Sequence, residues 1–255
     1  MENGDLDRTL ELLWRRTLGT PQGRRGPKQR VSVDEVIRAG IAVADEEGLP
    51  AFSMRKVADR LGLKLMSVYT YVPGRSELIG LMVDEVIGEV EHPPHEGDLR
   101  NRITGVARHM WDEFHRHPWL LQVESSRPWI GPNGSERYEW HLAALEGAGF
   151  TDLEMDLVVS LIGDFTKGAA STSILARRTA ERSGITDADW WAMHAPILER
   201  VMTPGAYPLS GRVGTAAGEE YNAIGDPDRS FGFGLERLLD GVELLLKNRK
   251  PRDVS

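Results

Sequence analysis

Cysteine is absent from this chain of 255 residues. Without thiols the protein can form no disulfide, no thiolate nucleophile and no cysteine-ligated zinc site. Stability must therefore come from side-chain packing. The length is sufficient for one small and one larger domain, each with its own buried core.

Long hydrophobic runs are also lacking. No apolar segment reaches the roughly 18 to 20 residues that span a bilayer. The N-terminus lacks the basic and then apolar pattern of a secretory signal. We therefore expect a cytoplasmic protein with no membrane partner.

Neither strand alternation of useful length nor an enzyme motif is present. His109, Glu113, His115 and His117 lie close together, but no His-Glu-x-x-His spacing occurs, and helical residues two apart face different directions. The glycine-rich segment 211–218 lacks the Lys-Ser or Lys-Thr of a phosphate-binding loop. We expect an all-α fold with no catalytic residues, no metal and no cofactor.

Net charge is unevenly distributed along the chain. The total is −8, but residues 24–75 hold ten Lys and Arg against six Asp and Glu, a balance of +4, so the remainder carries −12. Phosphate contacts require Lys and Arg. A basic N-terminal part on an acidic body therefore indicates a protein that binds nucleic acid with one end.

Three short helices and a connecting helix are predicted within residues 31–92. Ser32 and Glu35 have the spacing of a capping box, and the helix that they begin reaches Gly48. A second helix begins at Ser53, and a third covers about 64–72. The three-residue turn between them, Leu61-Gly62-Leu63, has the form of a helix-turn-helix corner.

The breaks that surround this region define the predicted domains. Pro73-Gly74 ends the third helix, and a fourth follows over 76–90. The Pro-Pro pair in the segment 92–97 cannot continue it. We predict an N-terminal extension and basic arm over 1–30, a DNA-binding domain over 31–92 and a ligand-binding and dimerisation domain over 96–255.

Residues 53–78 resemble the DNA-binding domain of the TetR family. The shared pattern is a hydroxyl residue, a basic residue, a hydrophobic-Ala pair, Leu-Gly-hydrophobic, a Ser-hydrophobic-Tyr triplet, an aromatic residue and a basic turn before Leu78. The segments 127–128, 142–150 and 163–168 more weakly resemble the tetracycline-repressor type of C-terminal domain. Met54 and Met66 depart from the residues common in the family, which affects the expected operator sequence.

The outward face of the third helix is predicted to read DNA bases. A helix of about nine residues spans roughly 13 Å and fits the major groove. Lys64 and Arg55 have the donors to bind guanine edges. The resemblance implies phosphate contacts from Ser53, Tyr69 and Tyr71 and a backbone clamp from Arg75. The predicted DNA-binding residues are Ser53, Arg55, Lys64, Ser67, Tyr69, Thr70, Tyr71, Arg75, Arg24, Arg25 and Lys28.

Other interpretations of these residues remain open at this point. Arg24, Arg25 and Lys28 belong either to a tail that is disordered without DNA or to an arm along the phosphates or in the minor groove. For Tyr69 the alternative is partial burial in the core, and for Ser53 it is a role only as the cap of its helix. Their combined spacing favours DNA contact.

The C-terminal part is predicted to be helical near 98–117, 118–125, 134–148, 152–182, 187–202 and 230–248. Residues 203–229, with five Gly and three Pro, are predicted to be a long loop. Apolar residues recur in the last helix with helical spacing, namely Phe231, Leu235, Leu238, Leu239, Val242, Leu245 and Leu246. The resemblance implies that this helix and 152–182 form a homodimer interface; packing within the chain is the alternative.

Aromatic residues cluster in the same part of the chain. Aromatic side chains are usually core, but the resemblance implies a ligand cavity built from these helices. The predicted ligand-binding residues are Trp111, Phe114, Trp119, Val123, Trp140, His141, Asp164, Phe165 and Trp190. Val123 and Glu124 occupy the position where tetracycline repressors bind a magnesium chelate through His, so metal-dependent tetracycline binding is not predicted.

The sequence thus predicts a homodimeric TetR-type repressor that binds double-stranded operator DNA and is released by a small hydrophobic or amphipathic effector. The main alternative is a helical DNA-binding protein whose C-terminal half only mediates protein contacts, without a ligand. A helical enzyme with an accessory DNA-binding domain is the third; it would require acid and base groups that converge in a cavity.

Overall fold

The computed structural model describes residues 3–18, 30–124, 129–202 and 205–248, with only the backbone for residues 3–7. Within these residues every regular element is a helix, which confirms the all-α prediction. None of the helices in this described part combines the length and apolar character needed to cross a membrane. Contacts divide the chain into two compact units, Met1–Val159 and Ser160–Ser255.

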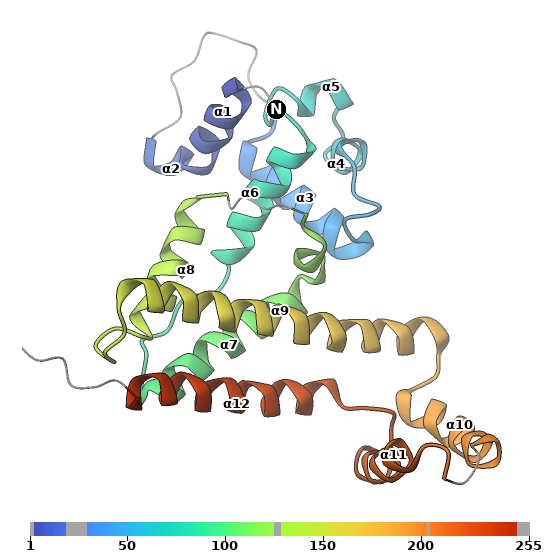
Figure 1. Ribbon diagram of the computed structural model, residues 1–255. Coiled ribbons are helices and arrows are strands. Elements are labelled where there is room, and N and C mark those ends of the chain that lie inside the picture. Colours follow the sequence, from blue (N-terminus) through green and yellow to red (C-terminus); the bar gives the residue numbers. More distant parts are fainter. Residues whose placement is uncertain (1–2, 19–29, 125–128, 203–204, 249–255) are drawn as a thin grey trace, which may run out of the picture. The chain divides into compact units, whose positions relative to one another are not determined.

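The first unit contains a small helical core. Its elements in chain order are α1 (Asn3–Leu13), α2 (Arg15–Leu18), α3 (Val33–Glu47), α4 (Met54–Arg60), α5 (Leu65–Val68), α6 (Arg75–Ile87), α7 (Leu99–Arg116), the 3₁₀ helix η1 (Pro118–Gln122) and α8 (Pro132–Ala143). Helices α3 to α6 bury their apolar faces together (Figure 1). Trp119 of η1 is fully buried in the same core, so η1 closes one side of it.

The capping predictions for the first core helix are confirmed. Ser32 Oγ accepts the Glu35 N–H at 3.1 Å, and the Glu35 carboxylate accepts the Ser32 N–H at 2.6 Å. These two bonds satisfy N–H groups that have no partner within the helix. Gly48 ends α3 as predicted, with a φ of +77° that favours glycine.

The amphipathic start of the chain forms two helices that pack against the first core. Leu13 is buried, and the indole N–H of Trp14 donates to the Ile130 carbonyl at 2.9 Å. The guanidinium of Arg15 pairs with Asp34. Burial alone would raise the pKa of Asp34, but the hydrogen bond and charge of Arg15, together with the charges of Arg16 and Arg38, outweigh burial and lower that pKa. Charge pairing therefore ties α2 to α3.

Helices α6 and α8 approach each other closely because glycine lies at their contacts. A β-carbon at residue 80 would lie 2.5 Å from Trp129, and one at residue 88 would lie 2.7 Å from Asn133. The buried Asp84 accepts the N–H of Gly134 at 2.9 Å. Asp84 thereby satisfies a free N–H in the first turn of α8.

The second unit is built on two long helices. Helix α9 (Asp152–Ser183) begins in the first unit and continues in the second, where α12 (Pro227–Lys247) lies beside it (Figure 1). The rings of Phe165 and Phe231 stack at 5.8 Å, and Ser173 Oγ donates to Asp228 at 2.8 Å. Helix α10 (Asp187–Val201) and helix α11 (Pro208–Tyr221) connect them.

Two of the predicted segments differ from the structure. The segment 203–229 is not one long loop, because α11 forms from Pro208, which is well placed in a first helical turn. The predicted helix 64–72 is shorter, because α5 ends at Val68. The N–H groups of Thr70 and Tyr71 bond three residues back, to Ser67 and Val68, so the chain tightens into turns.

Candidate DNA-binding surface and ligand region

The turn between α4 and α5 has the geometry that the sequence predicted. Gly62 has a φ of +63°, and its N–H donates to the Asp59 carbonyl at 3.1 Å. The Leu63 N–H donates to the Ala58 carbonyl at 2.9 Å. This pair of bonds forms a Schellman motif, which ends α4 and turns the chain directly into α5.

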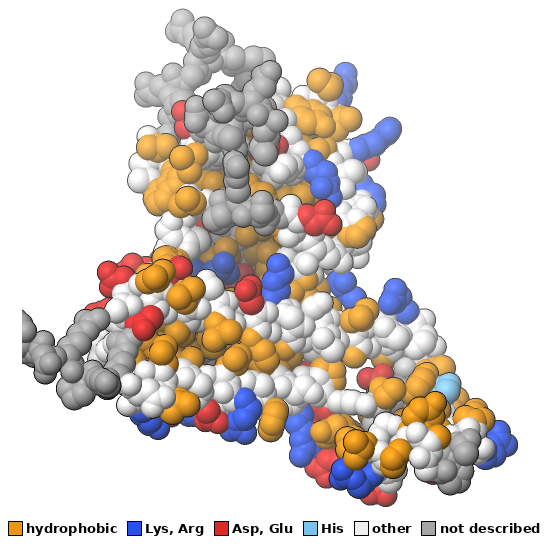
Figure 2. Space-filling model, in the orientation of Figure 1, with side chains coloured by type: hydrophobic (Ala, Val, Ile, Leu, Met, Phe, Trp, Pro, Cys, Tyr) orange, Lys and Arg blue, Asp and Glu red, His pale blue; other side chains and the backbone are white. Residues whose placement is uncertain are grey.

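The basic residues of α4 differ in their partners. Arg60 forms two 2.8 Å hydrogen bonds to Glu46, and Lys56 pairs with Glu47. Arg55 and Lys64 are exposed and have no ion-pair partner among the described residues. Arg55 and Lys64 are therefore available to bind an external anion near the turn between α4 and α5. Figure 2 shows Lys and Arg side chains over these two helices.

Three further predicted residues lie at or near the end of α5. Tyr69 and Thr70 are exposed, and Ser67 is half-buried. The Thr70 hydroxyl donates to the Ser67 carbonyl at 2.7 Å, and Arg8 of α1 donates to the Thr70 carbonyl at 3.2 Å. Arg8 was not predicted as part of this surface, because no local sequence pattern places the N-terminal segment beside the end of α5.

The remaining predicted DNA-binding residues have contacts within the chain. Ser53 Oγ accepts the Lys56 N–H at 3.3 Å and caps α4. Tyr71 is 6% exposed and belongs to the core. Arg75 donates to the Leu49 carbonyl at 2.9 Å, and its guanidinium lies over the Phe52 ring. Arg24, Arg25 and Lys28 lie outside the described residues.

A cluster of aromatic and imidazole rings lies at the side of α8. The Trp140 ring stacks with His92 at 5.1 Å and with His95 at 4.7 Å, and His109 lies 5.0 Å from it. His141 adjoins Trp140 in the chain and is buried. Trp140 donates to the Pro93 carbonyl at 2.7 Å. We call Trp140 and these four histidines the imidazole cluster.

Several nitrogens of the imidazole cluster have no hydrogen-bond partner in the described part of the chain. They are Nε2 of His92, both ring nitrogens of His109 and Nε2 of His141. Burial lowers the pKa of His92 and His109, and burial followed by the charge of Arg137 lowers the pKa of His141 to about 3. The buried rings are therefore neutral at pH 7 and have free polar atoms.

A buried ion pair lies among the charged groups that act on the cluster. Glu113 of α7 is 6% exposed, and both of its oxygens lie 2.9 Å from Nη1 of Arg137. Burying a carboxylate is costly unless it is paired. No group of three or more metal-ligating side chains is placed to hold a metal ion within the described ranges.

The other predicted ligand-binding residues are spread over the two units. Trp119 is fully buried, and its indole N–H donates to Asp45 at 2.8 Å. Phe114 packs against the first core. The Trp111 ring is tilted by 40° to the His115 ring, with the ring centroids 4.4 Å apart, and Trp190 stacks with His194 at 4.0 Å. Only Trp140 and His141 belong to the imidazole cluster.

Three of the predicted ligand-binding residues line cavities. Val123 lines one of about 600 Å³ beside Arg75 and Trp129. Asp164, which is exposed, and Phe165 line one of about 630 Å³ on the second unit. The sequence-based analysis missed His92, His95 and His109 as cluster members, because residues from a linker and two helices come together only in the fold.

The chain is similar to proteins of known class. The sequence model described as "Tetracyclin repressor-like, C-terminal domain" matches residues 93–246. The "HTH-type transcriptional repressor DrrR1" of Streptomyces coeruleorubidus is 39% identical over 253 residues, covering 97% of this chain and 89% of the relative. The "Tetracycline repressor protein class E" of Escherichia coli is 24% identical over 237 residues, covering 89% and 97%.

A solved structure resembles the same chain over most of its length. The TetR-family protein ActR of Streptomyces coelicolor, in complex with actinorhodin, has a TM-score of 0.67 and 26% sequence identity. The match covers 84% of this chain and 96% of ActR. The similarity thus extends over both the helix-turn-helix part and the C-terminal helices.

Proposed function

Because the chain belongs to the TetR family of transcriptional regulators, we propose that it represses transcription as a dimer on operator DNA and is released by a small hydrophobic or amphipathic ligand. The observation that carries this proposal is the helix-turn-helix with two exposed cations, Arg55 and Lys64, that have no ion-pair partner among the described residues, in a chain 39% identical to a named repressor. Such a protein acts in the cytoplasm, where operator DNA is.

In the proposed DNA complex, α5 and the turn before it enter the major groove. Arg55 and Lys64 contact guanine edges, since their side chains are exposed and unpaired. Ser67, Tyr69 and Thr70 contact bases or phosphates nearby. Ser53, Tyr71 and Arg75 support these residues from within the domain, because each is engaged in the chain itself.

A dimer is proposed because one helix-turn-helix makes too few contacts for tight specific binding. The predicted stripe on α12 needs a correction: Phe231, Leu235, Leu239 and Val242 are buried within the chain. Exposed apolar side chains in the second unit remain on α9 and α12, namely Leu161, Leu175, Phe233, Leu244 and Leu245. We propose that these form the dimer interface.

For the ligand, we propose the imidazole cluster as the binding region. Ring nitrogens of His92, His109 and His141 are buried and have no hydrogen-bond partner among the described residues, so a polar group that enters the cluster gains hydrogen bonds there. Trp140 offers an aromatic surface. Trp140 and His141 lie on α8, whose first turn is bound by Asp84 of α6. A ligand that moves α8 therefore acts on α6, which belongs to the core of the DNA-binding part, and shifts the population away from the DNA-competent state.

The DNA-binding proposal is tested by a gel shift with the DNA upstream of the coding region. We expect Arg55→Ala to cost roughly 1 to 3 kcal/mol in specific binding and to relax specificity. Arg60→Ala is the matched control, since it removes the same group from the same helix where it is already paired with Glu46. Absence of a specific complex at low salt, or an equal loss from both variants, would contradict the proposal.

The ligand region is tested by mass spectrometry of copurifying molecules and by a thermal-shift screen. A ligand that binds the folded state raises Tm. We expect Trp140→Leu to abolish that shift. Trp190→Leu, which removes an indole stacked on His194 instead, should retain it. The opposite pattern would place the ligand elsewhere.

A further inference from the structure

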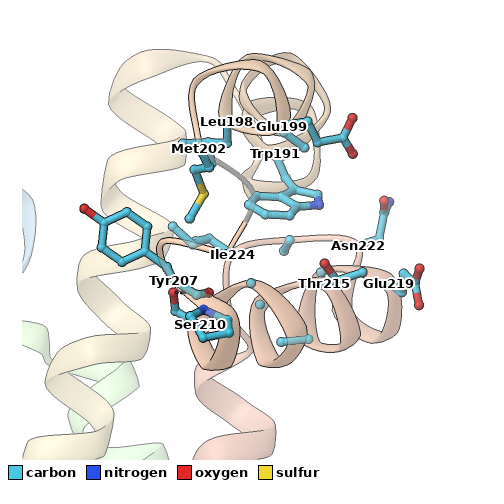
Figure 3. Close-up of a pocket in the computed structure, with 18 residues that line it drawn as sticks. Trp191, Leu198, Glu199, Met202, Tyr207, Ser210, Thr215, Glu219, Asn222 and Ile224 are labelled. Carbon is cyan, nitrogen blue, oxygen red and sulfur yellow. Dashed lines mark hydrogen bonds between the residues drawn. The ribbon is translucent and has the colours of Figure 1, made fainter.

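The hairpin of α10 and α11 encloses a cavity of its own in the second unit. Its volume is about 820 Å³, which is within the range of small-molecule sites. Figure 3 shows that Trp191 of α10 and Met202, which directly follows α10, face Ser210 and Thr215 from α11 across it. None of the ligand-binding residues predicted from the sequence lines this cavity.

The walls suit a flat, partly apolar molecule. Trp191 is half-buried and lies against Gly218, where a β-carbon would be only 2.5 Å from the indole ring. Glycine at this position therefore lets the indole lie directly on α11. Gly211 and Gly214 also line the cavity, and a β-carbon at either would meet open space. Without side chains at these two positions, α11 leaves room in the cavity beside it, and the Trp191 ring borders that space.

The charge of the lining has a single sign. Among the described residues that line it, only Glu199 from α10 and Glu219 from α11 are charged, and neither has an ion-pair partner in that part of the chain. In Figure 3 both carboxylates lie on the same side of Trp191. The neighbouring Glu220, by contrast, pairs with Arg229 at 2.6 Å and does not line the cavity.

From this arrangement we infer that the α10–α11 cavity binds a planar aromatic cation. The fused rings lie against the Trp191 face, which attracts positive charge through its ring quadrupole. The two unpaired carboxylates neutralise the cationic group. An anionic ligand of the same shape is repelled by both. This site is separate from the imidazole cluster, and the inference does not rest on the proposed function.

The experiment measures binding of two dyes to the full-length, DNA-free protein by fluorescence anisotropy. Rhodamine 6G is a planar cation, and fluorescein is an anion of similar ring shape. We expect rhodamine 6G to bind and fluorescein not to bind. Because Glu199 and Glu219 are both exposed, added salt should weaken rhodamine 6G binding. Equal binding of the two dyes, or no binding of rhodamine 6G, would overturn the inference.

Variants then locate the site. Glu199→Gln with Glu219→Gln should raise the Kd for rhodamine 6G about tenfold, whereas Glu220→Gln, the same change outside the cavity, should leave it unchanged. Gly214→Leu should block the cavity, since a β-carbon at residue 214 meets no atom within 4 Å. Gly105→Leu is its control, being an open helical glycine on α7. Rhodamine 6G binding that survives both cavity variants would show that the dye binds elsewhere.

Discussion

At the scale of single residues, Gly62 determines whether the helix-turn-helix corner can form. Its φ is +63°, yet a β-carbon there would meet no atom within 4 Å. We expect Gly62→Ala to lower the free energy of unfolding by about 1 kcal/mol, through backbone strain alone. Urea unfolding measures this loss.

The control for this substitution is Gly105→Ala in α7. Residue 105 is also open, but its backbone is helical, so alanine should stabilise the protein by up to about 1 kcal/mol. If both substitutions change stability in the same direction, the left-handed conformation at Gly62 is not the cause.

His141 gives stability a dependence on pH. Burial lowers its pKa from 6.5 to about 3 in the folded protein. Between these values the unfolded chain binds a proton that the folded chain does not, so stability falls as pH decreases below about 6.5. One such proton contributes about 1.4 kcal/mol per pH unit. His92 and His109 act in the same direction.

Urea unfolding at pH 7, 6 and 5 tests this dependence. Replacement of His141 by Leu should flatten the curve by about 1.4 kcal/mol per pH unit. Asp84 has the opposite effect on the pH dependence of stability, because burial raises its pKa and the folded chain therefore holds that proton more readily than the unfolded chain. This effect lies nearer the lower pH range in which carboxyl groups titrate. Parallel curves for the wild type and the variant would contradict a neutral, buried His141.

At the scale of helices, Asp84 joins α6 to α8. It accepts the Gly134 N–H at 2.9 Å and an Asn133 side-chain N–H at 3.3 Å. We expect Asp84→Ala to cost about 1 to 3 kcal/mol, since buried donors lose their acceptor. The same variant should also weaken the response of operator binding to ligand.

Asp84→Asn is the comparison, because it keeps one acceptor oxygen and the side-chain volume. It should retain more stability than Asp84→Ala in urea unfolding. Ligand response is read from operator release in a gel shift. An Asp84→Ala protein of lower stability but unaltered release would show that the α6–α8 contact is structural only.

Helix boundaries show what the sequence determines locally and what it does not. Caps are local, so Ser32 and Gly48 marked the ends of α3 correctly. Helix α11 was missed because its glycines resemble a loop. They are tolerated where helices approach closely, as Gly218 does against Trp191. Trp119 was predicted to line a cavity, yet it is fully buried, because aromatic residues are equally suited to both environments.

At the scale of the whole molecule, apolar surface remains exposed in the second unit. Phe233 is 66% exposed and Leu244 is 54% exposed. We expect Phe233→Glu with Leu244→Glu to convert the proposed dimer to a monomer, because buried carboxylates without partners would oppose association. Light scattering during size-exclusion chromatography measures the mass.

The matched control is Ile130→Glu, which places the same charge on another exposed apolar side chain, in the first unit. It should leave the mass unchanged. The monomeric variant should also lose operator affinity, because a single helix-turn-helix lacks the second half-site. A wild-type protein that is monomeric at micromolar concentration would contradict the interface.

The glycines between α6 and α8 have a consequence for how this sequence can change over time. Each faces one large partner: Gly80 faces Trp129, Gly88 faces Asn133 and Gly131 faces Asp84. A larger residue at any of them must be accompanied by a smaller partner. Mutations at the contact between α6 and α8 are therefore tolerated in pairs. We expect the residues at these paired positions to covary among related repressors.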